Sequence, residues 1–292
     1  MSTRWPRRLR RLAAGALASA ALALAALAGF AWAATHLRPG HHWTTPERRH
    51  LDAEEVHYGS TFAWRLPGRG PDTVFLFHGY GGSASNVLDE AAWFQARGFT
   101  AVCVDFPNSG GSEQTGTTLG WREADTVRGA VDGDAPRGRV LLFGQSMGSA
   151  AILRAVGAEG LHANALVLEN PYDNLVRTVG NRFEKLHLPR WPGAELLVLF
   201  GGLELGFDGF ALNPAEYARG VTAPTLLLAG DADERVRPED TRRVGDALAG
   251  PHTVELFPHA GHVAMRDADG QRWSRLVTGF LVAQGMLPGG GG

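Results

Sequence analysis

Six short and almost uninterrupted apolar runs constrain the fold of this chain more than any other feature of its sequence. They cover residues 73–77, 100–104, 140–143, 165–168, 225–229 and 253–257. Apolar runs without polar alternation are typical of strands in a sheet that is covered on both faces. Because helix-length stretches alternate with these runs, we predict an α/β fold with a doubly wound, mostly parallel sheet. We expect helices over residues 84–97, 118–132 and 267–284, and another that begins near residue 147.

The N-terminus differs from the rest because residues 12–34 form an uncharged run rich in alanine and leucine. A helix of this length spans about 34 Å, enough to cross the hydrocarbon core of a bilayer. Five arginines precede the run, which favours a cytoplasmic N-terminus and export of the remainder of the chain to the periplasmic or extracellular side. We therefore expect residues 1–34 to be a membrane anchor. The alternatives are a signal peptide cleaved after Ala31-Trp32-Ala33 and a helix packed within the fold.

The rest of the chain divides into a polar linker over residues 35–55, a folded domain over 56–288 and a flexible glycine-rich tail over 289–292. Without the five N-terminal arginines, 23 basic residues face 30 acidic residues, a net charge of −7. A net acidic domain gives no electrostatic reason to expect nucleic-acid binding. The single cysteine, Cys103, lies within an apolar run and is expected to be a buried strand residue. We expect neither a metal nor an organic cofactor.

One strand end carries the pattern of a serine nucleophile. The run over residues 140–143 is followed by GQSMG, with Ser146 at its centre, and then by a helix-competent stretch. Such a sharp turn strains the serine backbone, and glycines on both sides let the strand and the helix approach closely. We therefore expect Ser146 to stand clear of the sheet at the N-terminus of a helix, where a developing oxyanion is stabilised.

The loop after residues 73–77 reads HGYGG, and its glycines allow backbone N–H groups to turn toward that oxyanion. A tetrahedral intermediate needs two fixed donors, one from the residue after the nucleophile and one from a neighbouring strand end. We expect these donors to be the N–H groups of Met147 and Tyr80. His78 is expected to brace the loop by hydrogen bonds and to take no direct part in chemistry.

Two further strand ends supply candidates for a carboxylate and a base. The run over 225–229 is followed by GDADERV, in which Asp231 and Asp233 both qualify as the carboxylate that orients an imidazole. The run over 253–257 is followed by PHAGH, which offers His259 and His262. Spacing alone does not choose within either pair. The chain order of serine, acid and histidine is the one expected of a hydrolase with this type of sheet.

With these segments the chain resembles the α/β-hydrolase superfamily over nearly all of residues 55–285. The resemblance implies Asp233 as the acid, because the family's acid segment reads G-x-x-D-x-x-V, and it implies His262 as the base, because the family's histidine follows glycine or another small residue. The segment DFPNSGGS, residues 105–112, is similar to the family's D-x-R-G-x-G-x-S turn but lacks the arginine, so we expect it to be structural. In appearance the chain is most similar to the membrane-associated BEM46-like branch, whose substrates vary.

We therefore predict a serine hydrolase that cleaves a carboxylic ester or thioester, of a small-molecule or lipid-like substrate, through an acyl-enzyme on Ser146. The alternatives are a serine peptidase or amidase, because the same triad serves other leaving groups, and a membrane-tethered binding protein that has lost catalysis. The resemblance also implies that residues 170–222 form a short cap, with apolar side chains that line an acyl pocket or face the membrane. A plain core helix followed by a loop is the other interpretation of this segment.

Overall fold

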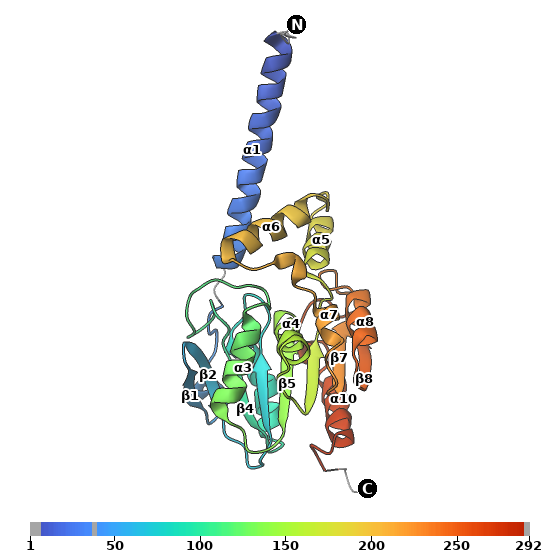
Figure 1. The fold of residues 1–292 in the computed structure, drawn as a ribbon. Helices are drawn as coiled ribbons and strands as arrows, with labels where there is room; N and C mark the ends of the chain where they lie inside the picture. Colours follow the sequence, from blue (N-terminus) through green and yellow to red (C-terminus); the bar gives the residue numbers. More distant parts are fainter. Residues whose placement is uncertain (1–6, 37–39, 289–292) are drawn as a thin grey trace.

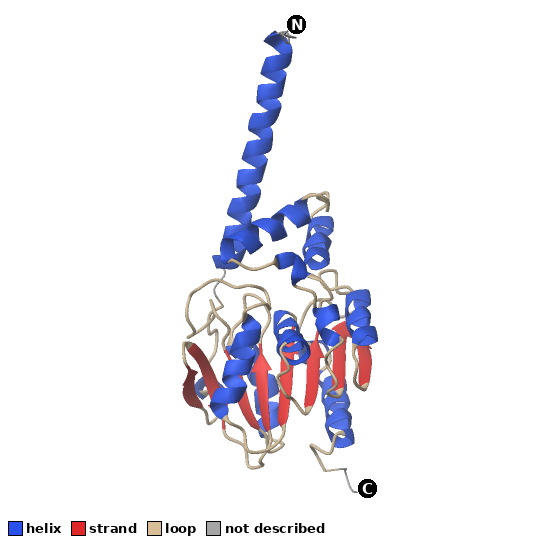
Figure 2. Cartoon of the chain, viewed as in Figure 1, coloured by secondary structure: helices blue, strands red, loops and turns tan. Residues whose placement is uncertain are grey.

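The computed structural model describes residues 7–36 and 40–288 of the chain. Eight strands form one sheet with helices on both faces, and one long helix rises from the same end of the molecule as a pair of shorter helices (Figure 1, Figure 2). The strands are β1 (Glu54–Tyr58), β2 (Thr61–Leu66), β3 (Thr73–Phe77), β4 (Thr100–Val104), β5 (Val140–Gln145), β6 (Ala165–Glu169), β7 (Thr225–Gly230) and β8 (His252–Phe257). The glycine-rich tail predicted at residues 289–292 lies outside the described residues.

The sheet has the spatial order β1-β2-β4-β3-β5-β6-β7-β8, and the pairs from β4 through β8 are all parallel. The six apolar runs of the sequence correspond to β3 through β8, so the predicted mostly parallel sheet is confirmed. The sequence does not predict β1 and β2, which pair antiparallel with each other and join β4 at the edge. β1 is exposed for most of its length and reads EEVHY, so it lacks the apolar run by which the other strands were found.

Ten α-helices precede, connect or follow these strands in the described part of the chain. They are α1 (Arg7–His36), α2 (Leu88–Gln95), α3 (Glu123–Asp134), α4 (Met147–Leu153), α5 (Leu175–Lys185), α6 (Gly193–Leu205), α7 (Pro214–Ala218), α8 (Pro238–Ala247), α9 (Met265–Ala268) and α10 (Gly270–Ala283). Phe94 of α2 and Trp273 of α10 are buried in the core on one face of the sheet. Val127 of α3 and Val244 of α8 are buried in the core on the other face.

Helix α3 begins five residues later than the sequence predicts, because a carboxylate organises the loop before it. The buried Glu123 side chain accepts hydrogen bonds from the backbone N–H groups of Thr118 and Gly120 and from the hydroxyl of Thr117. Leu119 within this loop has a φ of 61°, which an α-helix does not allow. The helix-competent sequence at 118–122 is therefore held as a tight turn.

The segment predicted to be a linker contacts the body of the protein closely in its described part. Gly40 forms an isolated bridge with Ser109, and the hydroxyl of Ser83 donates to the carbonyl of His41. The adjacent histidine, His42, places Nε2 2.7 Å from the carboxylate of the buried Asp105. His42 is therefore bonded to the folded domain, whereas the sequence places it in a polar linker. Local sequence could not reveal this contact, because its partner lies 63 positions away.

The insertion between β6 and β7 forms a helical pair above the carboxyl ends of the strands. Helices α5 and α6 lie on the side of the molecule from which α1 emerges (Figure 1). Asn174 caps the start of α5 by accepting from the N–H of Arg177. Leu175 and Val179 of α5 pack with Ala194 and Val198 of α6 in a small apolar cluster separate from the two cores of the sheet.

Candidate active site

The turn between β5 and α4 holds Ser146 in a strained backbone conformation. Its φ is +51° and its ψ is −106°, in a region that residues with a side chain rarely adopt. A Cβ atom on Gly148 would lie 2.4 Å from the Phe77 carbonyl oxygen, and one on Gly144 would lie 2.7 Å from the backbone of Gly148. Both flanking glycines are therefore required for the close contact of strand and helix. The turn has the form that the sequence predicts.

The structure brings the predicted serine, histidine and aspartate together. The Nε2 atom of His262 lies 3.1 Å from Ser146 Oγ, and its Nδ1 atom lies 2.6 Å from Asp233 Oδ2. Because a carboxylate only accepts hydrogen bonds, Nδ1 carries the proton and Nε2 is left as the acceptor for the serine hydroxyl. The three side chains come from the loops after β5, β7 and β8, at the carboxyl ends of the parallel strands.

Asp233 is buried, and its other oxygen accepts hydrogen bonds from the N–H groups of Arg235 and Val236. These bonds stabilise the charged carboxylate in a place from which water is excluded. The two candidates that sequence spacing could not exclude lie elsewhere. Asp231 is exposed and accepts from the backbone N–H of His259, so these two residues brace the same loop and neither contacts Ser146 through a hydrogen bond in the described structure.

The loop after β3 lies next to Ser146. A Cβ atom on Gly79 would lie 3.6 Å from the Cβ of Ser146, which is an ordinary van der Waals contact. The buried His78 ring accepts from the Phe106 N–H at Nε2 and donates from Nδ1 to the Gly79 carbonyl, 2.7 Å away. Burial lowers the pKa of His78, which keeps the ring neutral in this bracing role. Tyr80 follows in the same loop.

Met147 is the first residue of α4, where the backbone N–H has no acceptor within the helix. The N–H of the preceding residue, Ser146, donates to the Glu169 carbonyl at 2.8 Å. The Met147 N–H therefore lies in the first turn of α4, at the positive end of the helix dipole. The sequence predicts it as one of the two oxyanion donors.

The last turn of α1 lies against the loop that carries Tyr80 and against the loop before α3 that carries Thr117. The Tyr80 hydroxyl donates to the Ala34 carbonyl, and the Thr117 N–H donates to the Thr35 carbonyl at 3.1 Å. The Thr117 hydroxyl in turn lies 3.4 Å from the Met147 sulfur. The end of the N-terminal helix thus contacts Tyr80 directly and is connected to Met147 through Thr117. Sequence reasoning missed this arrangement, since nothing local to residues 34–36 indicates it.

Sequence reasoning also missed Glu169, the last residue of β6, which lies beneath the site. Its carboxylate accepts from the indole N–H of Trp273 at 2.7 Å and from the N–H of Met265, three residues after the histidine, at 3.1 Å. Burial raises the pKa of Glu169 to about 7 and that of its buried neighbour Glu90 to about 8. The available signal was a charged residue at the end of an apolar run, the position at which the other site residues were sought.

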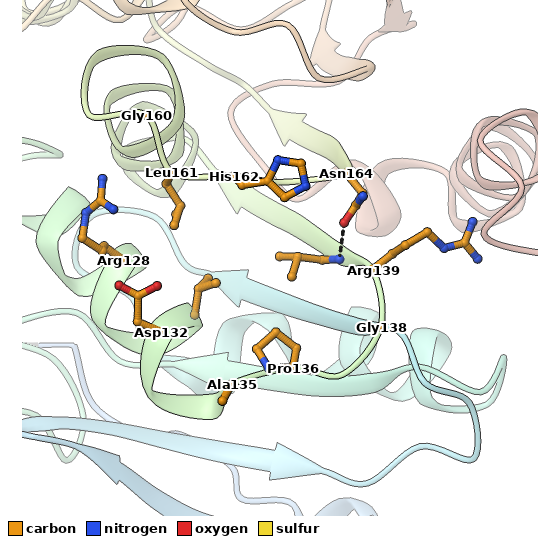
Figure 3. A pocket seen from close by; sticks show the side chains of 12 residues that line it. Arg128, Asp132, Ala135, Pro136, Gly138, Arg139, Gly160, Leu161, His162 and Asn164 are labelled. Atoms are coloured by element: carbon orange, nitrogen blue, oxygen red, sulfur yellow. Dashed lines mark hydrogen bonds between the residues drawn. The ribbon is translucent and has the colours of Figure 1, made fainter.

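A cavity of about 600 Å³ lies at the amino ends of the strands, on the side of the sheet away from Ser146 (Figure 3). Arg128, Asp132 and His162 line it, near the amino ends of β5 and β6. Asn164 accepts there from the Val140 N–H, as the dashed line in Figure 3 shows. This cavity is separated from Ser146 by the full length of β5. In parallel sheets ligands bind at the carboxyl ends of the strands, so we place the candidate site there and not in this cavity.

Comparison with known proteins agrees with this arrangement. The chain is 22% identical over 217 residues to the uncharacterized protein YqkD of Bacillus subtilis, covering 72% of this chain and 71% of that protein. It is 28% identical over 234 residues to the uncharacterized protein Rv2307c of Mycobacterium tuberculosis, covering 77% and 75%.

Solved esterases share the fold. The Pyrococcus furiosus esterase Pf2001 superimposes with a TM-score of 0.67 and 24% identity, covering 82% of this chain and 94% of that one. The propionate-bound esterase Est2 of Thermogutta terrifontis gives 0.62 and 22%, covering 82% and 97%. The sequence profile of the alpha/beta hydrolase family matches residues 74–274. The chain therefore belongs to the alpha/beta hydrolase family.

Proposed function

We propose that this protein is a serine hydrolase that cleaves a carboxylic ester or thioester through a covalent acyl-enzyme on Ser146. The observation that carries the proposal is the unbroken chain of contacts from Ser146 Oγ through His262 to the buried Asp233, at 3.1 Å and 2.6 Å. These distances lie within hydrogen-bond reach, which is the geometric requirement for a nucleophile and its general base. The esterase activity of similarly folded proteins agrees with this reaction.

In the first half of the reaction, Ser146 Oγ attacks the carbonyl carbon of the ester while its proton passes to His262 Nε2. Asp233 stabilises the imidazolium that results. The N–H groups of Met147 and Tyr80 hold the negative oxygen of the tetrahedral intermediate. The carbon–oxygen bond to the leaving group then breaks, and His262 returns the proton to the departing alcohol.

In the second half, a water molecule takes the place of the alcohol. It gives a proton to His262 Nε2 and attacks the acyl carbon, and the bond to Ser146 Oγ breaks as the proton returns to that oxygen. The carboxylic acid leaves and the enzyme is restored. A thioester follows the same steps with a thiol as the leaving group.

The test is labelling with a fluorophosphonate, which reacts only with an activated serine. We expect the full-length protein to be labelled and the Ser146→Ala and His262→Ala variants to remain unlabelled. The His259→Ala variant is the matched control, because His259 lies in the same loop without contacting Ser146, and it should label like the wild type. Absence of labelling in a folded wild-type protein would refute the proposal and favour a binding protein.

We further propose that α1 is an uncleaved membrane anchor that leaves the hydrolase domain on the periplasmic or extracellular side. Residues 11–36 are long and apolar enough to cross a bilayer. Cleavage after Ala33 would remove the helix whose last turn is held by Tyr80 and Thr117. Mass spectrometry of the protein isolated from its native membrane should find the arginine-rich N-terminus, and a chain that begins at Ala34 would contradict the proposal.

A further inference from the structure

The cap exposes large apolar side chains that the body of the protein keeps buried. The residues concerned are Leu186, Leu188, Trp191, Leu199, Leu203 and Phe210, which we call the cap surface. Trp191 is 75% exposed and Leu203 is 71% exposed. Exposure of such an apolar patch to water is unfavourable, so the patch marks a surface that contacts an apolar phase or an apolar partner.

Helix α6 contributes to this surface because the two turns between Glu195 and Glu204 are apolar around the whole circumference. No charge occurs from Leu196 to Leu203, and only one face of the helix, which includes Val198 and Gly202, is buried against the cap. A groove of about 420 Å³ runs beside the helix, and Leu199, Leu203 and Phe210 help to line it together with Val198, Gly202 and Asp208. A helix that is apolar on all sides is expected inside a protein or a membrane, not on a wet surface.

The position of α1 indicates which apolar phase covers the cap. Its residues 11–26 are exposed, and the first buried residue is Ala31, where the helix has reached the body and lies beside α6. The roughly 20 residues before Ala31 rise about 30 Å, which equals the thickness of a bilayer's hydrocarbon core. A bilayer spanned by this part of α1 ends at the level of the cap.

Side chains typical of a membrane–water interface lie at that level. Trp32 of α1 is 47% exposed, and the loop between α5 and α6 carries Trp191 between Arg190 and the start of α6, with Lys185 just before it. Tryptophan and basic residues gather where a protein leaves the hydrocarbon region. Figure 1 places this loop at the end of the cap farthest from the sheet, on the side from which α1 emerges.

We propose that the cap surface lies in the lipid bilayer that α1 crosses, so that the protein docks on the membrane through two elements and its candidate active site faces the lipid. The substrate would then be an acyl ester drawn from that bilayer. This statement about the substrate rests on the proposed hydrolase function, whereas the membrane contact does not. Arg182 of α5 lies 5.9 Å from the centre of the Tyr80 ring, so the cap reaches the same oxyanion loop that α1 contacts.

A probe on the cap surface tests the contact directly. Cys103, the chain's single cysteine, is buried, so a Leu203→Cys variant of the full-length protein can be labelled selectively with an environment-sensitive fluorophore. The labelled protein is reconstituted in vesicles of phosphatidylcholine and phosphatidylglycerol that contain a lipid with a nitroxide near its headgroup. The matched control is His162→Cys, an exposed position near the amino end of β6, away from the cap.

We expect the probe at 203 to show blue-shifted emission and quenching by the nitroxide lipid, and the probe at 162 to show neither. An unquenched, red-shifted probe at 203 would overturn the proposal. A blue shift that grows with the ratio of protein to lipid but is not quenched would also overturn it, because a second copy of the chain would then cover the surface.

The substrate class needs a second experiment. In the Leu199→Gln/Leu203→Gln variant we expect hydrolysis of a vesicle-embedded ester to fall by about tenfold or more, because two leucine side chains that are proposed to lie in the lipid are replaced by polar ones. Fluorophosphonate labelling and hydrolysis of a soluble short-chain ester should be unchanged. The Leu199→Met/Leu203→Met control keeps the apolar area and should behave as the wild type.

Equal losses on the two substrates would overturn the lipid-substrate assignment. Failure of the wild type to label or to cleave the soluble ester would instead refute the hydrolase proposal and leave the probe measurement valid.

Discussion

The body and the cap of this protein use the same apolar residue types in opposite ways. Trp273 in the body is completely buried and makes edge-to-face contacts with Trp93, Phe94 and Phe143. Trp191 in the cap is the most exposed large apolar residue of the described chain. Apolar burial stabilises the body within one molecule, whereas the exposed side chains of the cap surface can gain the same free energy only from a surrounding apolar phase. We therefore propose that the body carries out the chemistry and that the cap holds it at the membrane.

The largest expected effect lies in the body. Replacing Asp233 by Asn leaves its shape but lets the amide hold His262 in the wrong tautomer, so we expect kcat for a soluble ester to fall about 10³–10⁴-fold. The Asp231→Asn variant, two residues away, should stay close to wild-type activity. Steady-state kinetics with a p-nitrophenyl ester provide the measurement. Similar losses in both variants would show that the loop as a whole is being disturbed and would remove the special role of Asp233.

A pair of tryptophan substitutions tests the difference in burial. We expect Trp273→Ala to lower the free energy of unfolding by about 3–5 kcal/mol, because it leaves a cavity in a closed core. Trp191→Ala in detergent should change it by no more than about 0.5 kcal/mol. Denaturant titration followed by circular dichroism reports both values. A large loss at Trp191 would mean that the cap is stabilised like the body, and the comparison would fail.

A smaller effect on the free energy of unfolding is expected from the buried carboxyl group of Glu90, the neighbour of Glu169. Burial and the nearby Glu169 raise the pKa of Glu90 to about 8, and one of its oxygens has no hydrogen-bond partner among the described residues. The folded state therefore binds this proton more tightly than the unfolded chain, whose carboxyl titrates near 4.5. The resulting stability is complete below about pH 4.5 and is lost as the pH rises through about 8.

Glu90→Gln should remove this dependence and make the protein more stable than the wild type at pH 9, on the order of a few kcal/mol. At pH 5 the two proteins should differ little. Thermal unfolding across this pH range is the measurement, with the exposed Glu239→Gln on α8 as the control. A wild-type protein whose stability does not fall between pH 5 and pH 9 relative to Glu90→Gln would contradict the raised pKa.

The sequence predicts well what depends on neighbouring residues. The strained turn at Ser146 is local, since its glycines and its strand lie within a few positions, and the six buried strands reveal themselves through their own composition. It does not reveal the edge strand β1, whose polar side chains match its exposure, or the turn before α3, which depends on Glu123. Spacing alone left Asp231 and Asp233 as equal candidates for the acid. They differ in where the folded loop points their side chains, toward the His259 backbone for Asp231 and toward the His262 ring for Asp233.

Apart from the predicted contacts of Ser146, His262 and Asp233, contacts between distant segments could not be predicted. Glu169 is connected to Trp273 across 104 positions, and Tyr80 is connected to Ala34 across 46. Neither partner carries a local pattern that points to the other. Periodicity and motifs describe each element separately, and these bonds arise only when the elements are assembled.

The bond between Tyr80 and Ala34 has a practical consequence for anyone who wishes to prepare a soluble form of the enzyme. A chain trimmed to begin at Ala34 would carry a new ammonium group beside the loop that is proposed to bind the oxyanion, and it would lack the helical turns that hold the Ala34 carbonyl in place. Kinetic constants from such a fragment would describe an altered catalyst. A soluble form that starts upstream of Leu27 retains the turns that lie against α6 and is the better subject for assay.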